Sequence, residues 1–234
     1  MLKKSTIIPV AEAVVDIAKR RELFFSKTRD LLKSELLNAD GTGRIPQFNA
    51  PWREPLWCLA ALYTGSSEDI ALANKVVANY IKAPAVQSEK MKESSGHQFG
   101  IFQSNTLAYL LHQFGHLMTG DALETARFHC NMLFSTRHGS AQIEYIFQGV
   151  NDNMPMMSTY GLILGGEAMG NEQAVKHGLW KLHQFRRHLS RCAWASEYNS
   201  STYTAVTLAG AARIASFAHD EEIRQLALEI EQRL

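Results

Sequence analysis

The sequence predicts an all-α protein built from antiparallel helical hairpins that follow one another about 50 residues apart. Three observations support this prediction. Apolar residues recur at helical spacing over most of the chain, and alternating apolar runs bounded by Asn-Gly turns, which would indicate strands, are missing from the sequence. A short polar segment also recurs before four of the apolar stretches. Helices arranged in this way bury their apolar faces against one another.

The composition is that of a folded globular chain. Of the 234 residues, 46% are hydrophobic and 20% are charged, and 24 basic residues against 23 acidic ones leave a net charge of +1. This balance excludes intrinsic disorder, and it argues against nucleic acid as the main partner, because phosphate binding needs a surplus of basic side chains. No stretch approaches the roughly 20 apolar residues that cross a bilayer, so no membrane partner is predicted.

The first element is a helical N-terminal segment, 1–45, which precedes hairpins over 46–234 in one predicted domain. An apolar stripe runs from Val10 to Leu37 in this segment; its members are Val14, Ile17, Leu23, Phe24, Leu31, Leu32 and Leu36. The N-terminus opens with two lysines but meets Glu12 and Asp16 before a long apolar region forms, which is unlike a signal peptide. A cytoplasmic protein is therefore expected, or a periplasmic or secreted one if residue 1 is not the natural start.

Eight further apolar stretches follow in order, and each predicts a helix. They are Leu56–Tyr63, Ile70–Ile81, Leu107–Leu117, Leu123–Phe134, Met156–Met169, Val175–Leu189, Tyr203–Ala218 and Ile223–Leu234. Short polar breaks separate the two members of each pair: Thr64-Gly65-Ser66, Thr119-Gly120-Asp121, Met169-Gly170-Asn171 and His219-Asp220. Glycine ends a helix in the left-handed conformation, and Ser, Asp or Asn caps the next one. Each pair is therefore predicted to form a tight hairpin.

The recurring polar segments introduce the first helix of each pair. They are Phe48-Asn49-Ala50-Pro51, Phe102-Gln103-Ser104-Asn105, Val150-Asn151-Asp152-Asn153 and Tyr198-Asn199-Ser200-Ser201. Long connections lead into them, over 39–53, 83–103, 135–153 and 190–201. These connections exceed the usual 2–8 residues between packed helices, which is typical of functional loops. Because short and long connections alternate, all the long ones are expected at the same end of the array.

Two of these junctions carry a resemblance to a known group of proteins. The stretch Glu197-Tyr198-Asn199-Ser200-Ser201-Thr202-Tyr203 entering Ala205–Ala218, and the stretch Asn151-Asp152-Asn153-Met154-Pro155, are similar to loop–helix junctions of α/α-toroid enzymes. These are the six-hairpin glycosidases and the polysaccharide lyases of the alginate-lyase and heparinase type. The resemblance covers roughly residues 46–234 and implies part or all of an α/α toroid that acts on carbohydrate.

The chain is short for a full ring of that kind. Six hairpins would need roughly 300 residues, and four are predicted after the N-terminal segment. An incomplete ring, a fragment of a longer protein or an open α-solenoid are the alternatives. A partial ring would leave the last helix with an exposed apolar face at Leu226, Leu228 and Ile230, through which copies could associate.

Polar residues of the long loops and the first helical turns are the candidate site. Amides, aromatic rings and ionisable groups that meet at one rim would suit a sugar, since rings stack on pyranoses and amides or Arg bind hydroxyls and carboxylates. The catalytic candidates are His97, Asp152, Asn153, Glu197 and Tyr198; the substrate-binding candidates are Trp52, Arg53, Gln98, Asn151, Asn199 and Tyr203. The plainer interpretation is that the amides are helix caps and the rings fill the core.

Two reactions are compatible with these residues. Hydrolysis of a glycosidic bond needs two carboxyl groups, and Asp152 and Glu197 are the best pair. β-Elimination beside a uronate needs an amide or Arg to neutralise the carboxylate, with a His or Tyr base and a Tyr acid. The residues available for these roles are His97, Tyr198, Asn153, Gln98 and Arg53. Elimination is slightly favoured. A non-catalytic α-solenoid that binds a protein or peptide on its concave face is the alternative from another class.

No cofactor or metal is predicted. The sequence has no phosphate-binding glycine loop and no nucleophile elbow. Three widely spaced cysteines, Cys58, Cys130 and Cys192, are expected to be buried free thiols. His112 and His116 have the i, i+4 spacing of a metal pair but lack the Glu of a zincin, so they are expected to pack one helix face. The predicted partner is a saccharide substrate.

Overall fold

The structure, a computed structural model, describes residues 17–44, 53–80, 96–134, 146–149, 151–192, 195–197 and 199–234. Nine α-helices and no β-strand occur in these ranges, which confirms the all-α prediction. The helices are α1 (Ile17–Leu31), α2 (Arg53–Tyr63), α3 (Ser67–Tyr80), α6 (Gly96–Phe114), α7 (Gly120–Leu133), α8 (Asn153–Met169), α9 (Glu172–Cys192), α10 (Ser201–Phe217) and α11 (Glu221–Glu231). None of them is long and apolar enough to cross a membrane.

The helices pair as the sequence predicts: α2 with α3, α6 with α7, α8 with α9 and α10 with α11, each across a short turn. The turn between α8 and α9 shows the expected chemistry. Gly170 is left-handed with φ 65°, its N–H donates to the carbonyl of Glu167, and the side chain of Asn171 accepts from the N–H of Ala174. Glycine therefore ends one helix and an amide caps the next.

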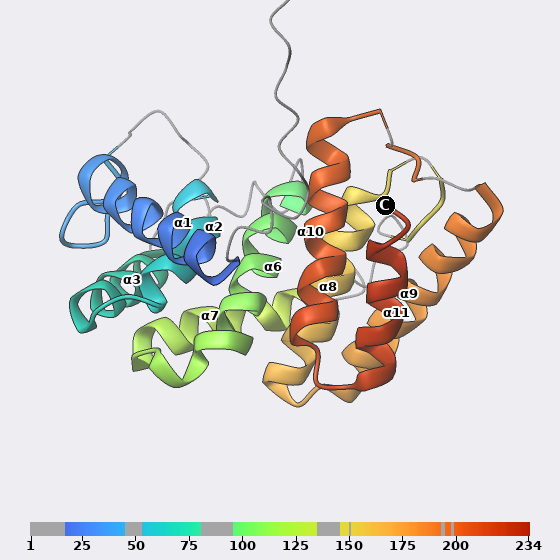
Figure 1. Ribbon diagram of the computed structural model, residues 1–234. Coiled ribbons are helices and arrows are strands. Elements are labelled where there is room, and N and C mark those ends of the chain that lie inside the picture. The colour runs from blue at the N-terminus through green and yellow to red at the C-terminus, as the bar shows by residue number, and fades with distance from the viewer. Residues whose placement is uncertain are drawn as a thin grey trace, which may run out of the picture.

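Contacts between the pairs place the helices in two rows. The first members, α2, α6, α8 and α10, contact one another in chain order, and α6, α8 and α10 run side by side through the middle of the molecule (Figure 1). Among the second members, α3 packs on α7 and α9 packs on α11. Helices α6, α8 and α10 share a direction, and the short turns that follow them lie at one end (Figure 1).

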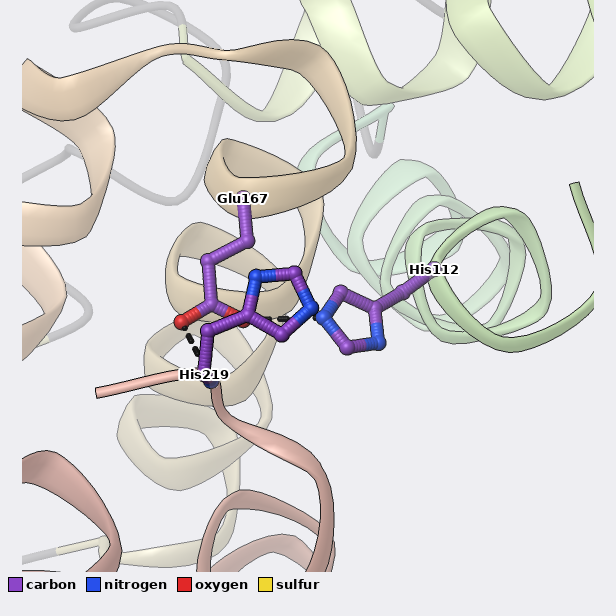
Figure 2. Close-up of side chains that lie close together, drawn as sticks. All are labelled: His112, Glu167 and His219. Atoms are coloured by element: carbon purple, nitrogen blue, oxygen red, sulfur yellow. Dashed lines mark hydrogen bonds and ion pairs between the residues drawn. The ribbon is translucent and has the colours of Figure 1, made fainter. Parts of the chain in front are cut away.

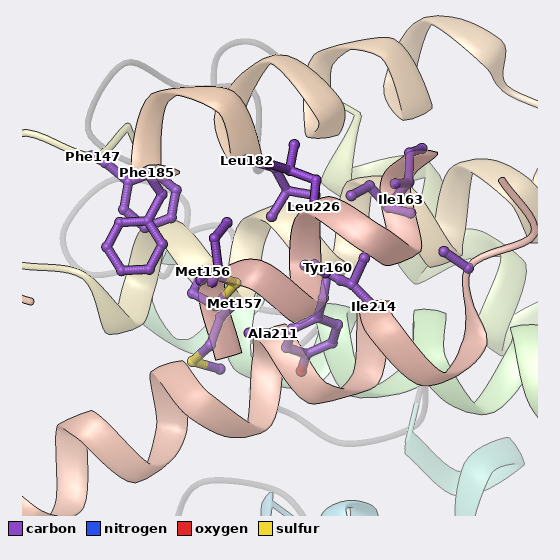
Figure 3. Close-up of a cluster of buried hydrophobic side chains, with 14 of the residues drawn as sticks. Phe147, Met156, Met157, Tyr160, Ile163, Leu182, Phe185, Ala211, Ile214 and Leu226 are labelled. Carbon is purple, nitrogen blue, oxygen red and sulfur yellow. The ribbon is translucent and has the colours of Figure 1, made fainter. Parts of the chain in front are cut away.

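The largest apolar cluster holds α8 to α11 together. It includes Met156, Tyr160, Leu182, Phe185 and Ile214, all of which are buried (Figure 3). The burial of apolar side chains in this cluster is the main contribution to the stability of the four helices. Helix α8 lies at its centre, and every residue from 155 to 166 is buried.

Close approach of the helices depends on small residues. A Cβ at Gly178 of α9 would lie 2.5 Å from Cγ1 of Ile163 on α8. A Cβ at Gly161 of α8 would meet the amide of Asn105 on α6 in the same way. These glycines let α8 pack closely against both of its neighbours.

The start of α6 differs from the prediction. The connection predicted over 83–103 is too long, because α6 already begins at Gly96 and continues past Gly100. Gly100 within the helix lowers helix stability by only about 1 kcal/mol relative to alanine. Burial of the residues from Gln103 onward outweighs this cost. Gln103 is thus a buried residue of α6 and does not introduce it.

Three burial predictions are also wrong. Leu23, Phe24 and Leu31 of the N-terminal stripe are exposed, because α2 and the adjoining turn at 32–36 are the main contacts of α1 among the described elements. Leu226 and Ile230 are buried, since α11 packs on both α9 and α10, and only Leu228 of that set is exposed. None of the three cysteines is in a disulfide, as predicted, but Cys58 is only half-buried and Cys192 is exposed.

Candidate functional site

Three predicted site residues, Asp152, Asn153 and Glu197, meet at the N-terminus of α8. Glu197, in the connection before α10, accepts hydrogen bonds from the backbone N–H groups of Asp152 and Asn153, at 3.0 and 2.9 Å. Its other oxygen accepts from the side-chain amide of Asn153 at 2.7 Å. A carboxylate from one hairpin therefore caps the first helix of the preceding hairpin, where unpaired N–H groups favour a negative charge.

Asp152, in turn, accepts hydrogen bonds from the 195–197 segment. It is fully buried, and its Oδ2 accepts from the backbone N–H and the hydroxyl of Ser196, at 2.5 and 2.6 Å. Its Oδ1 is buried and has no hydrogen-bond partner within the described part of the chain. Glu197 thus holds the backbone of Asp152 and Asn153, and Asp152 in turn holds the backbone of Ser196, so hydrogen bonds run both ways between α8 and the 195–197 segment.

The remaining candidates are spread over the same end or lie outside the described residues. Asn151 is exposed and caps α8 by accepting from the N–H of Met154 at 3.1 Å. Asn199 and Tyr203 are exposed as well. Trp52 and Tyr198, together with the side chains of Arg53, His97 and Gln98, lie outside the described part of the structure. The described residues thus bring together Asp152, Asn153 and Glu197.

Polar side chains also line the inner face of α6. Gln103 and Ser104 are buried, and Oε1 of Gln103 and the hydroxyl of Ser104 have no hydrogen-bond partner among the described atoms. Thr106 hydrogen-bonds the hydroxyl of Tyr160 on α8. The interface between α6 and α8 is therefore polar toward the start of α6 and becomes apolar at Leu107 and Ala108.

A buried lysine, which the sequence analysis did not identify, lies between α8 and α9. Lys181 is fully buried, and its ammonium group donates to the hydroxyl of Ser158. Burial lowers the pKa of Lys181 well below its ordinary value. A Ser–Lys pair can form a nucleophile, but this one is closed off from solvent, so its role in the described structure is packing.

A second polar cluster lies at the turn end of the array. His112 Nε2 lies 2.8 Å from Oε2 of Glu167, and His219 Nδ1 lies 3.8 Å from the same oxygen (Figure 2). The backbone N–H of His219 donates to the other oxygen of Glu167 at 2.8 Å. The side chains of His112 and Glu167 are buried, whereas that of His219 is 72% exposed. These three groups could hold a metal ion.

The three residues stand near the ends of the first helices of successive hairpins. His112 and Glu167 stand in the last turns of α6 and α8, and His219 follows the end of α10. They are 55 and 52 residues apart. The recurring polar segments that begin these hairpins are 48 residues apart, so a comparison of equivalent positions of the repeat does not bring the three residues together. His116 is exposed and is not part of the cluster, so the expectation that His112 and His116 both pack one helix face is wrong for His116.

The two clusters lie at opposite ends of α8, which at 17 residues separates them by about 25 Å. Neither cluster can be interpreted through a relative. No protein family, curated protein or solved structure matches the chain.

Proposed function

We propose that the protein acts on an acidic saccharide by β-elimination at the loop end of the array. The hairpins and the alternation of short and long connections support this proposal, together with the resemblance of the 151–155 and 197–203 junctions to α/α-toroid enzymes. In its finer form, the proposal takes the two rows of helices as part of an α/α toroid.

One observation favours elimination over hydrolysis. Asp152 is fully buried, and both oxygens of Glu197 already accept hydrogen bonds from the start of α8. A general acid or nucleophile of a glycosidase must reach the glycosidic bond, and these two carboxylates instead hold backbone groups. Their role in the proposed site is to fix the segment that carries Tyr198 against α8.

The reacting groups are then the neutral and aromatic candidates. Asn153 is itself buried and its amide already donates to Glu197, so Arg53 or Gln98 is the proposed partner of the uronate carboxylate, which acidifies the neighbouring proton. His97 or Tyr198 then removes that proton, and Tyr198 protonates the leaving oxygen. Trp52, Arg53, Gln98, Asn151, Asn199 and Tyr203 are the proposed saccharide contacts.

The test uses the purified chain with polyuronate and glycosaminoglycan substrates. Elimination is measured by the ultraviolet absorbance of the unsaturated uronate, and hydrolysis by new reducing ends without that absorbance. Tyr198→Phe should abolish the unsaturated product and leave the helical circular dichroism unchanged, because only a hydroxyl is removed. Glu172→Gln, an exposed change at the turn end, is the control and should retain activity.

The result that overturns elimination is equally specific. If reducing ends form without unsaturated product, and Asp152→Asn or Glu197→Gln abolishes them, the carboxylates are the catalysts. If no saccharide is cleaved or bound and none of these substitutions changes any activity, the polar segments are helix caps. The protein is then better described as a non-catalytic α-solenoid scaffold. The exposed Tyr203 and Leu208 of α10 would form part of its docking surface.

A further inference from the structure

The cluster at the turn end has the ligand set of a metal site. We infer that His112, Glu167 and His219 bind one divalent transition-metal ion, for which Zn²⁺ is the best match. Two imidazoles and one carboxylate form a known protein ligand set for zinc, with the fourth position left to water. This inference is independent of the proposed saccharide reaction, since the two sites lie at opposite ends of α8.

The spacing of the ligand atoms fits such an ion. Nε2 of His112, Oε2 of Glu167 and Nδ1 of His219 all lie within 4.8 Å of one another. Zinc bonds to nitrogen and oxygen of about 2.0–2.2 Å in a tetrahedron require ligand atoms about 3.3 Å apart. The observed separations from the carboxylate oxygen, 2.8 and 3.8 Å, lie on either side of that value. Small rotations of the rings would therefore suffice.

The groups around the ligands hold them in position. Oε1 of Glu167 is fixed by the backbone N–H of His219, so Oε2 is directed toward both rings (Figure 2). Arg224 donates to the carbonyls of Ala218 and His219 and thereby fixes the turn that carries the exposed ligand. Such supporting contacts are typical of metal sites, where they orient the ligands.

The side-chain amide of Gln113 can hydrogen-bond Nδ1 of His112 in either tautomer of the ring. Its amide nitrogen lies 2.7 Å from Nδ1, which places the ring hydrogen on Nε2, from where it is donated to Glu167. Metal binding needs the lone pair of Nε2 and moves the hydrogen to Nδ1. Turning the amide of Gln113 over then presents its oxygen to that hydrogen, so the second ring nitrogen keeps its partner.

The surroundings favour a cation and leave it accessible. Helices α6, α8 and α10 all end at this cluster, and the carboxyl end of a helix carries a partial negative charge. His219 is 72% exposed, which leaves one side open for an ion to enter and for water to occupy the fourth position. An ion bound here would link the second, third and fourth hairpins.

The experiment measures Zn²⁺ binding to the metal-free chain by calorimetry, with thermal unfolding in parallel. One Zn²⁺ per chain should bind and raise the melting temperature. His219→Ala, a change at an exposed turn, should weaken binding by at least about tenfold without unfolding the protein. Glu167→Gln should weaken it as well. His116→Ala, which removes an exposed histidine outside the cluster, is the matched control and should bind as the wild type does.

Co²⁺ identifies the ligands independently of affinity. Co²⁺ in place of Zn²⁺ should give visible absorption typical of nitrogen and oxygen ligands without a thiolate band, and His219→Ala should remove it. The inference is wrong if Zn²⁺ does not bind stoichiometrically, or if it binds His219→Ala and Glu167→Gln as tightly as His116→Ala. In that case the cluster is a hydrogen-bonded clamp, and Glu167→Gln lowers stability with no response to Zn²⁺.

Discussion

His129 is a buried base without a hydrogen-bond partner among the described atoms. Both ring nitrogens are shielded from solvent, and the ring packs against that of Tyr80 with centroids 4.7 Å apart. Burial lowers the pKa of His129 from 6.5 to about 4, because the charged ring would lose its hydration. The folded protein therefore holds this histidine neutral over a range in which the unfolded chain takes up a proton.

His129 should make the protein sensitive to acid. Since the folded pKa lies below the unfolded one, its contribution to stability is complete above pH 6.5 and is lost as the pH falls toward 4. Relative to His129→Leu, the wild type should lose about 2 kcal/mol of unfolding free energy between pH 7 and pH 5. Urea unfolding of both proteins across this range measures the difference.

His116→Gln, at an exposed position, is the control and should follow the wild-type curve. Equal pH dependence in wild type and His129→Leu would contradict the interpretation of His129 as a buried neutral ring. Lys181 acts in the same direction, because burial lowers its pKa as well, so the variant comparison is needed to isolate the histidine.

At the scale of elements, the contact between α8 and α9 depends on Gly178. A methyl group at this position would lie 2.5 Å from Cγ1 and 3.3 Å from the backbone nitrogen of Ile163, which is itself fully buried. Neither atom can move away without shifting α8. The absence of a side chain therefore sets the distance between these two helices.

Gly178→Ala should destabilise the protein, although alanine is the better helix former. Because the contact would be as short as 2.5 Å, the overlap should cost about 2–3 kcal/mol, which exceeds the gain of about 1 kcal/mol in helix propensity. Gly120→Ala is the matched control, because a Cβ there meets nothing within 4 Å. Thermal unfolding should show a lower melting temperature for Gly178→Ala alone; a rise in both variants would contradict the close packing.

The elements show what the sequence could predict. Helical periodicity identifies all four hairpins, and short polar breaks identify their turns, because both signals are local. Among these four described turns, the expected left-handed glycine occurs only at Gly170: Gly65 and Gly120 are not left-handed, and the turn before α11 has no glycine. The start of α6 differs from the prediction because Gly96 and Gly100 are typical of a loop, whereas α6 runs through both glycines and only packing decides where the helix begins.

For the sites, too, the sequence predicts what is local and does not predict what depends on packing. Asp152, Asn153 and Glu197 could be found as polar residues before helices. Their mutual hydrogen bonds depend on how two hairpins lie together, which local pattern does not contain. Glu167 and His219 were missed for that reason, since each is unremarkable until the ends of α8 and α10 meet His112.

At the scale of the whole molecule, α8 is the helix packed on most sides, whereas α1 lies at the surface. Helix α8 contacts α6, α7, α9 and α10 and is buried without interruption from 155 to 166. Helix α1 packs chiefly on α2 and the adjoining turn, and most of its described residues are half-buried or exposed. Local opening of a helix costs less where it buries less apolar surface.

Amide hydrogen exchange should therefore differ between the two helices. Amides of α8 should exchange only through global unfolding and should follow the unfolding free energy as denaturant is added, whereas those of α1 should exchange faster through local opening. Native-state exchange with mass spectrometry measures both in one sample. Equal protection of α1 and α8 would show that α1 is part of the cooperative core.

The central position of α8 also has a consequence for synthesis. Two of its neighbours, α6 and α7, precede it in the chain, but α9 and α10 follow it, and α10 is complete only about 50 residues after α8 ends. At about 5–20 residues per second, the ribosome needs roughly 2–10 seconds to supply them. During that interval α8, the most apolar of the described helices, has one side uncovered in the nascent chain. Chaperone binding is expected to concentrate on α8, and slow codons between α8 and α10 would prolong the exposure.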